Sequence, residues 1–102
     1  MSHRPPKNVA AVAKRALKMR RDYGRGGTLV GVHRAVQLAH RQPLSDETIK
    51  RMWSYFRRHS VDRDAPGFFR GPTFPSAGRI AWDLWGGDPA VRWVKAILKR
   101  LA

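Results

Sequence analysis

The apolar residues of this chain recur at intervals of three and four, in stretches separated by glycine and proline, and this spacing constrains the fold more than any other feature. An α-helix has about 3.6 residues per turn, so side chains with this spacing lie on one face. No stretch alternates apolar and polar residues over a useful length. The sequence therefore predicts an all-α fold, a compact bundle of about five helices.

The first two expected helices occupy the N-terminal part of the chain. One covers about residues 6–23 and ends at a glycine-rich segment, and its inner face is formed by Val9, Val12, Ala13, Ala16 and Leu17. The next starts with Thr28 as N-cap and reaches about residue 41, because a threonine hydroxyl can accept a hydrogen bond from a first-turn amide. Its inner face is predicted to consist of Leu29, Val32, Val36 and Ala39.

Three further helices follow. The third starts at the N-cap Ser45, ends near residue 59 or 60 and buries Ile49, Met52, Trp53 and Phe56. The fourth runs from Ser76 to about Trp85, with Ile80, Ala81 and Leu84 facing inward. Asp88 and Pro89 form an N-cap and N1 pair for the fifth, which is expected to pack through Val91, Val94, Ile97, Leu98 and Leu101.

Residues 61–75 are rich in glycine and proline and are predicted to form a loop. This loop also carries Phe68, Phe69 and Phe74, which indicates that it folds back onto the core. A chain of 102 residues is the size of one domain, so we expect a single helical domain over residues 1–102. Residues 1–5 are expected to be flexible.

The charge balance indicates a polyanionic partner. Lys and Arg total 21 against 7 acidic residues, a formal net charge of +14. The positive side chains of such a surface repel one another unless a polyanion neutralises them. Arginine suits phosphate and base recognition because its planar guanidinium donates two parallel hydrogen bonds. Nucleic acid is the favoured partner, bound mainly through one Lys/Arg face, with DNA favoured over RNA; a structural or protein-interaction module with a protein partner is the alternative. The chain has no transmembrane or signal-type apolar stretch, which predicts a cytoplasmic protein without a membrane partner.

Eight basic residues are the candidates for nucleic-acid contact. Four follow one stripe of the first helix and its end, and four lie on the polar side of the third helix: Lys14, Lys18, Arg21, Arg25, Lys50, Arg51, Arg57 and Arg58. The segment 29–58 has the outline of a helix-turn-helix, in which the second helix would enter the major groove. An ordinary antiparallel pair of helices has the same outline, so both interpretations stay open.

Other chemistry receives less support from the sequence. Trp82, Trp85 and Trp93 could stack on unpaired bases, but their helical spacing favours a structural role in the core. The chain has no cysteine. Five residues could suggest metal or acid–base chemistry, but their spacing does not match that of zinc ligands: His33, His40, His59, Asp62 and Asp64. We therefore expect that the protein is not an enzyme and binds no cofactor or metal. The remaining catalytic hypothesis is a small metal-dependent nuclease that uses His59 or Asp62.

One motif resembles a known module. The chain contains Ile-Ala-Trp-Asp-Leu-Trp-Gly-Gly-Asp at 80–88, Tyr-Gly-Arg-Gly-Gly-Thr at 23–28 and the helix start Leu-Ser-Asp-Glu-Thr at 44–48. Together these resemble a small helical module encoded in bacteriophage and prophage genomes. The resemblance implies an origin in a phage or mobile element and adds the phage particle as a second location, and it assigns no functional residue.

Overall fold

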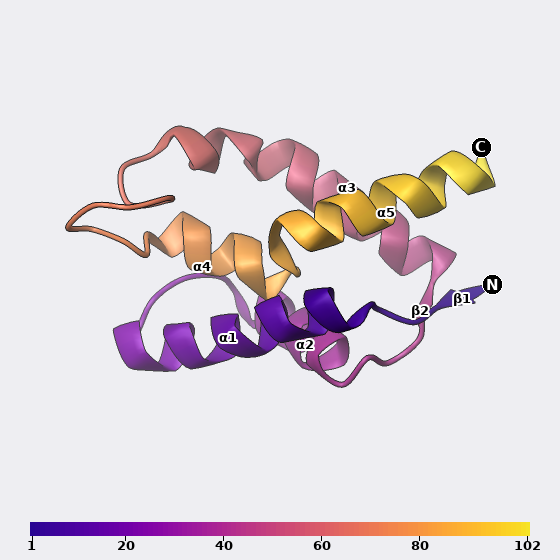
Figure 1. Cartoon of the computed structure of the whole chain (residues 1–102), viewed down its shortest axis with the longest axis horizontal. Coiled ribbons are helices and arrows are strands. Elements are labelled where there is room, and N and C mark those ends of the chain that lie inside the picture. The colour runs from indigo at the N-terminus through magenta and orange to yellow at the C-terminus, as the bar shows by residue number, and fades with distance from the viewer.

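The computed structural model describes residues 1–102 and confirms the predicted all-α bundle (Figure 1). Its five α-helices are α1 Lys7–Tyr23, α2 Leu29–Ala39, α3 Asp46–His59, α4 Ala77–Leu84 and α5 Gly87–Leu101. A 3-10 helix, η1, covers Ser60–Asp64, and a two-stranded sheet joins β1 Ser2–His3 to β2 Leu44–Ser45. No helix has both the length and the hydropathy that a membrane span requires.

The helices form a bundle with α4 and α5 in its middle. α1 packs mainly on α2 and α4, and α3 packs mainly on α5, whereas α4 and α5 each contact both α1 and α3 (Figure 1). One continuous apolar core joins them and includes Ala13, Leu38, Met52, Trp82 and Ile97, one residue from each of the five helices. The surfaces of α1 and α3 therefore face different sides of the molecule.

The expected start signals of three helices are confirmed. The side chain of Thr28 accepts from the amide of Gly31, that of Ser45 from Thr48, and that of Ser76 from Arg79. The fifth helix begins two residues earlier than expected, because Gly86 with φ 102° is its N-cap. Asp88 therefore lies inside the first turn and does not cap the helix.

The inner face of α2 differs from the prediction. Gly31, Arg34, Ala35 and Leu38 are buried, whereas Leu29 is 79% exposed and Val36 is 43% exposed. The face is rotated because a β-carbon on Gly31 would lie 3.3 Å from Nε1 of Trp85, so the smallest residue of the helix faces the indole. The helix also ends at Ala39, before the expected residue 41, and Arg41 has a positive φ of 52°.

The loop partly follows the prediction. Phe68 is buried in the core as expected, but Phe69 is 56% exposed and Phe74 is 38% exposed. Regular structure was not expected after residue 60, yet the 3-10 helix η1 continues the chain directly from α3 over Ser60–Asp64. On α5, Val94 and Ile97 are buried, whereas Leu101 at the C-terminal end is 41% exposed.

The first five residues, which we expected to be flexible, are held against the body of the protein. Ser2 and His3 pair with Ser45 and Leu44 in antiparallel register. Nε2 of His3 lies 2.6 Å from a carboxylate oxygen of Asp46, and this hydrogen bond lowers the pKa of that carboxyl. Pro5 is buried, and Nε of Arg41 donates to its carbonyl at 2.8 Å. Long-range pairing of this kind has no local sequence signal.

Candidate nucleic-acid interface

Most of the positive charge of the protein has no acidic partner within the fold. Only three of the 21 Lys and Arg side chains form an ion pair with a carboxylate: Lys18 with Asp22, Arg63 with Asp88, and Arg79 with Asp83. Two more of the seven acids pair with histidine, Asp46 with His3 and Asp62 with His59. The acids are thus largely engaged, and the surplus of cations is left to solvent or to a ligand.

The eight candidate residues fall into two groups. Lys14, Lys18 and Arg21 are exposed along α1, and Arg25 follows at its end. The other four are exposed on α3: Lys50, Arg51, Arg57 and Arg58. α4 and α5 lie between α1 and α3 (Figure 1), so the cations of α1 and those of α3 belong to helices on different sides of the bundle. The protein therefore has two separate basic surfaces.

The packing of α2 and α3 gives the helix-turn-helix interpretation no support. In that motif the two helices pack against each other across a short turn. Here the main contacts of α2 are with α1 and α4, and those of α3 are with α5 and η1. The six residues between the helices include β2, which pairs with the N-terminal strand.

Two of the α3 arginines share a groove with the start of α2. Arg51 and Arg58 are seven residues apart and so lie on the same side of α3, and both line an open groove of about 590 Å³. Thr28 and Val30 line its opposite wall. Nη1 of Arg58 donates to Oγ of Ser54 at 2.7 Å, which holds the guanidinium at the groove. We call this feature the arginine groove.

The N-terminus of α2 adds free donors to the arginine groove. Thr28 Oγ1 accepts from the amide of Gly31 at 3.2 Å, but the amides of Leu29 and Val30 have no acceptor in the protein. The first turn of α2 contains no acidic residue. Free amides and the positive end of the helix dipole together favour an anion at this position.

Arg34 adds a buried positive charge beside this groove. It is only 9% exposed and forms no ion pair; its guanidinium donates to the side-chain oxygen of Gln37 and lies 5.5 Å from the ring centre of Trp85. Its Nε is buried without a hydrogen-bond partner. Burial, and then the charge of Arg51, lower the pKa of Arg34. Two guanidiniums without a carboxylate partner therefore raise the local positive potential.

Stacked rings line the base of the arginine groove. The ring of Tyr55 lies 4.5 Å from that of Trp85, at an interplanar angle of 8°, and 4.5 Å from that of His59. The Tyr55 hydroxyl is buried without a partner, and burial raises its pKa, so it stays a neutral donor. The one acid at this groove, Asp62, lies 3.3 Å from Nδ1 of His59.

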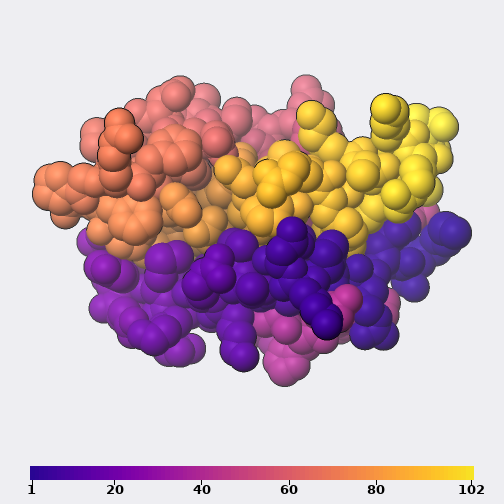
Figure 2. Space-filling view, viewed as in Figure 1, coloured from indigo at the N-terminus to yellow at the C-terminus, as the bar shows by residue number.

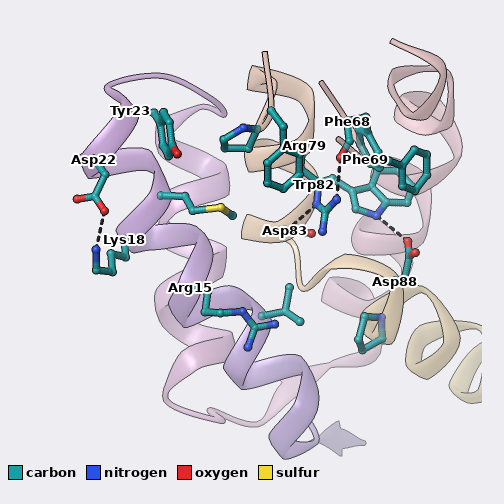
Figure 3. A pocket seen from close by; sticks show the side chains of 15 residues that line it. Arg15, Lys18, Asp22, Tyr23, Phe68, Phe69, Arg79, Trp82, Asp83 and Asp88 are labelled. Carbon is teal, nitrogen blue, oxygen red and sulfur yellow. Dashed lines mark hydrogen bonds and ion pairs between the residues drawn. The ribbon is translucent and has the colours of Figure 1, made fainter. Parts of the chain in front are cut away.

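A second groove, of about 620 Å³, lies between α1 and the glycine- and proline-rich loop (Figure 3). Arg15, Lys18 and Tyr23 border it on the α1 side, and Phe69 and Arg79 lie on the other side. Nε of Arg79 donates to Asp83 at 2.9 Å and Nη1 donates to the carbonyl of Phe68 at 2.7 Å, which ties the loop to α4. We call this feature the aromatic groove.

Neither groove contains a recognisable metal site. No group of three or more His, Asp or Glu side chains is close enough to hold a metal ion. His33 is exposed on α2, His40 is exposed at its C-terminal end, and the contact of His59 with Asp62 stands without a third ligand. The nuclease hypothesis therefore gains no support from the geometry.

Sequence reasoning missed several residues in or beside the two grooves. The sequence did not indicate Arg34, because the predicted inner face of α2 consisted of other residues. It did not indicate Tyr55 either, because the spacing within a helix does not show which distant ring a tyrosine stacks on. Phe69 and Phe74 were expected to pack inward with Phe68. The charge of the chain predicted basic surfaces, but only the packing shows which cations share a groove.

Comparison of the chain with models of protein families, with curated proteins and with solved structures gave no match.

Proposed function

We propose that the protein binds nucleic acid, with DNA as the favoured form, and that the arginine groove holds backbone phosphates. The observation that supports this proposal is the placement of Arg51, Arg58 and the free amides of α2 around one groove whose single carboxylate is already engaged by His59. These donors match the oxygens of a phosphate in charge and in hydrogen-bonding capacity.

The arginine groove would position the sugar–phosphate backbone of the nucleic acid. Guanidinium groups can each donate two hydrogen bonds to a phosphate, and the α2 amides can donate to an adjacent oxygen. Such contacts fix the register of a nucleic acid and carry no base information. The exposed cations of α1 form the second basic surface, at which further phosphates can be neutralised. Binding without base readout is therefore the expected mode on duplex DNA.

The test measures affinity for a random-sequence duplex by fluorescence anisotropy over a series of salt concentrations. If about six phosphates are neutralised, log affinity falls against log salt with a slope on the order of −5. Replacing Arg51 and Arg58 together by Gln removes two of these contacts, so the slope becomes shallower by about 2.

The matched control is the double change Lys99→Gln and Arg100→Gln, at the exposed end of α5, which removes the same net charge. The proposal requires that the groove variant lose clearly more affinity than this control. Affinity for duplex that does not change with salt, or equal losses in the two variants, would contradict it. Circular dichroism of both variants confirms that the helices are retained.

A protein-interaction module, such as a component of a phage particle, is the second candidate. The observation that favours it is the exposed apolar face of α2, where Leu29, Val30 and Val36 have no partner. Replacing Leu29 and Val36 by Ser leaves the duplex affinity unchanged if nucleic acid is the ligand. Because Trp85 is only 9% exposed, its replacement would disturb the core and does not distinguish the candidates.

A further inference from the structure

We propose that the aromatic groove binds the unpaired bases of single-stranded nucleic acid. This inference rests on the proposed function and adds the form of the ligand: a strand whose bases are free to stack, held beside the basic surface of α1. The groove is distinct from the arginine groove, because no residue lines both.

Three exposed aromatic side chains line the aromatic groove. Tyr23 is 50% exposed, Phe69 is 56% exposed and Phe74 is 38% exposed. Exposure on this scale is unusual for rings in a chain that buries Trp82 to 4% and Trp85 to 9%. Exposed rings beside a basic surface are the platforms on which single-strand-binding proteins stack bases.

A guanidinium accompanies each of the three exposed rings. Arg25 lies 5.4 Å from the ring centre of Tyr23, Arg63 lies 5.2 Å from that of Phe69, and Arg79 lies 5.4 Å from that of Phe74. In each pair the guanidinium lies over the ring, as in a cation–π contact. A base can stack on an aromatic face or on an arginine plane, so each pair offers a stacking position.

The charges within the groove favour bases over phosphates. Its lining contains three cations and three acids, and two of the cations are already paired, Lys18 with Asp22 at 2.6 Å and Arg79 with Asp83 at 2.9 Å (Figure 3). A nearly neutral, aromatic lining attracts a phosphate only weakly, because it has little net positive charge. It suits the uncharged face of a nucleobase.

The rim of the groove supplies the charge that the interior lacks. Lys14 and Arg21 are one helical turn from Lys18 on α1, and neither has an acidic partner. Arg25 donates to the carbonyl of Pro75 at 2.9 Å, which places its guanidinium at the end of the groove. Figure 2 shows the surfaces of α1 and of the loop segment meeting on one face of the molecule. Phosphates can therefore follow the α1 rim while bases enter the groove.

The experiment compares fluorescent single-stranded oligothymidine, on the order of ten nucleotides long, with a duplex of random sequence. The test variant carries Phe69→Leu and Phe74→Leu, which keep apolar side chains and remove the flat faces. If each ring stacks one base, affinity for the single strand falls roughly 5- to 150-fold per ring, and affinity for the duplex is unchanged. Tyr23→Leu should act in the same direction, and Tyr23→Phe should retain binding.

The control carries Val61→Ala and Leu101→Ala, two exposed apolar residues outside the groove. The inference is overturned if the aromatic variant keeps its affinity for the single strand, or if it loses affinity equally for single strand and duplex. The proposed function still stands in that case if the Arg51 and Arg58 variant loses duplex binding. Failure of the unmodified protein to bind either nucleic acid would overturn both. Thermal unfolding of each variant shows whether the fold is retained.

Discussion

Replacing Gly86 by Ala tests the packing at the turn between α4 and α5. This residue has φ 102°, a conformation that side chains with a β-carbon rarely adopt. A β-carbon placed there would lie 2.5 Å from the β-carbon of Ala90, 2.9 Å from Cγ1 of Val9 and 3.5 Å from Cδ1 of Leu38. All three neighbours are fully buried, so none can move into solvent to relieve the overlap.

Gly71 provides the matched control. It has φ 99°, almost the same as Gly86, but a β-carbon there would have no heavy atom within 4 Å. Gly71→Ala therefore carries only the backbone strain, about 1–3 kcal/mol, reduced slightly by the loss of freedom in the unfolded chain. Gly86→Ala adds overpacking of the core, about 1–3 kcal/mol more.

The measurement is equilibrium unfolding in urea followed by tryptophan fluorescence, which reports on the adjacent Trp82 and Trp85. For a domain of this size each additional kcal/mol lowers Tm by about 4–8 °C, so the two variants should also separate in thermal unfolding. If their free energies of unfolding agree within about 0.5 kcal/mol, the close approach of Gly86 to the core is refuted.

Three further predictions follow from single contacts. Tyr55→Phe removes a buried hydroxyl that has no partner, so the free energy of unfolding measured in urea should stay equal or rise. A loss of duplex affinity in this variant would show that the hydroxyl donates a hydrogen bond to the nucleic acid. Thr28→Ala removes the cap of α2 and should cost about 1 kcal/mol in the same assay, whereas Thr28→Ser should cost little. Burial raises the pKa of Asp88, but hydrogen bonds from Arg63 and Trp82 outweigh it and leave the pKa below its usual value. The stabilising effect of the carboxylate is therefore fully present above about pH 4 and is lost as the pH falls through the folded-state pKa, so Asp88→Asn should destabilise at pH 6 and the difference should shrink steadily as the pH is lowered below about 4. A difference between Asp88→Asn and the unmodified protein that does not shrink as the pH is lowered below about 4 would contradict this account.

The local signals predicted most of the fold. Thr28, Ser45 and Ser76 marked helix starts correctly, because an N-cap interacts only with amides two or three residues further along the chain. The helix boundaries of α1 and α3 followed from spacing and from the breakers beside them. Errors appeared where the neighbour is distant in sequence: α2 was rotated by its contact with Trp85, and Asp88 was displaced from its expected cap position by Gly86.

The candidate site shows the same division between local and distant contacts. The excess of Lys and Arg is a property of the sequence alone, and so is the exposure of the charged stripe on α1. Which cations meet in a groove depends on how α2, α3 and α4 pack, and Arg34 became a buried cation only because Gly31 and Ala35 share its side of α2. Spacing within one helix does not specify contacts between helices.

The sequence by itself determined that this chain is helical, where three of its helices begin, and that it carries a large surplus of positive charge. Only the tertiary structure decided that this charge is divided between two surfaces, that Phe68 is buried while Phe69 and Phe74 line a groove, and that the N-terminal strand pairs with β2. Helix formation and capping depend on neighbours within a few residues, whereas burial and the shape of a groove depend on side chains that packing brings together from distant parts of the chain.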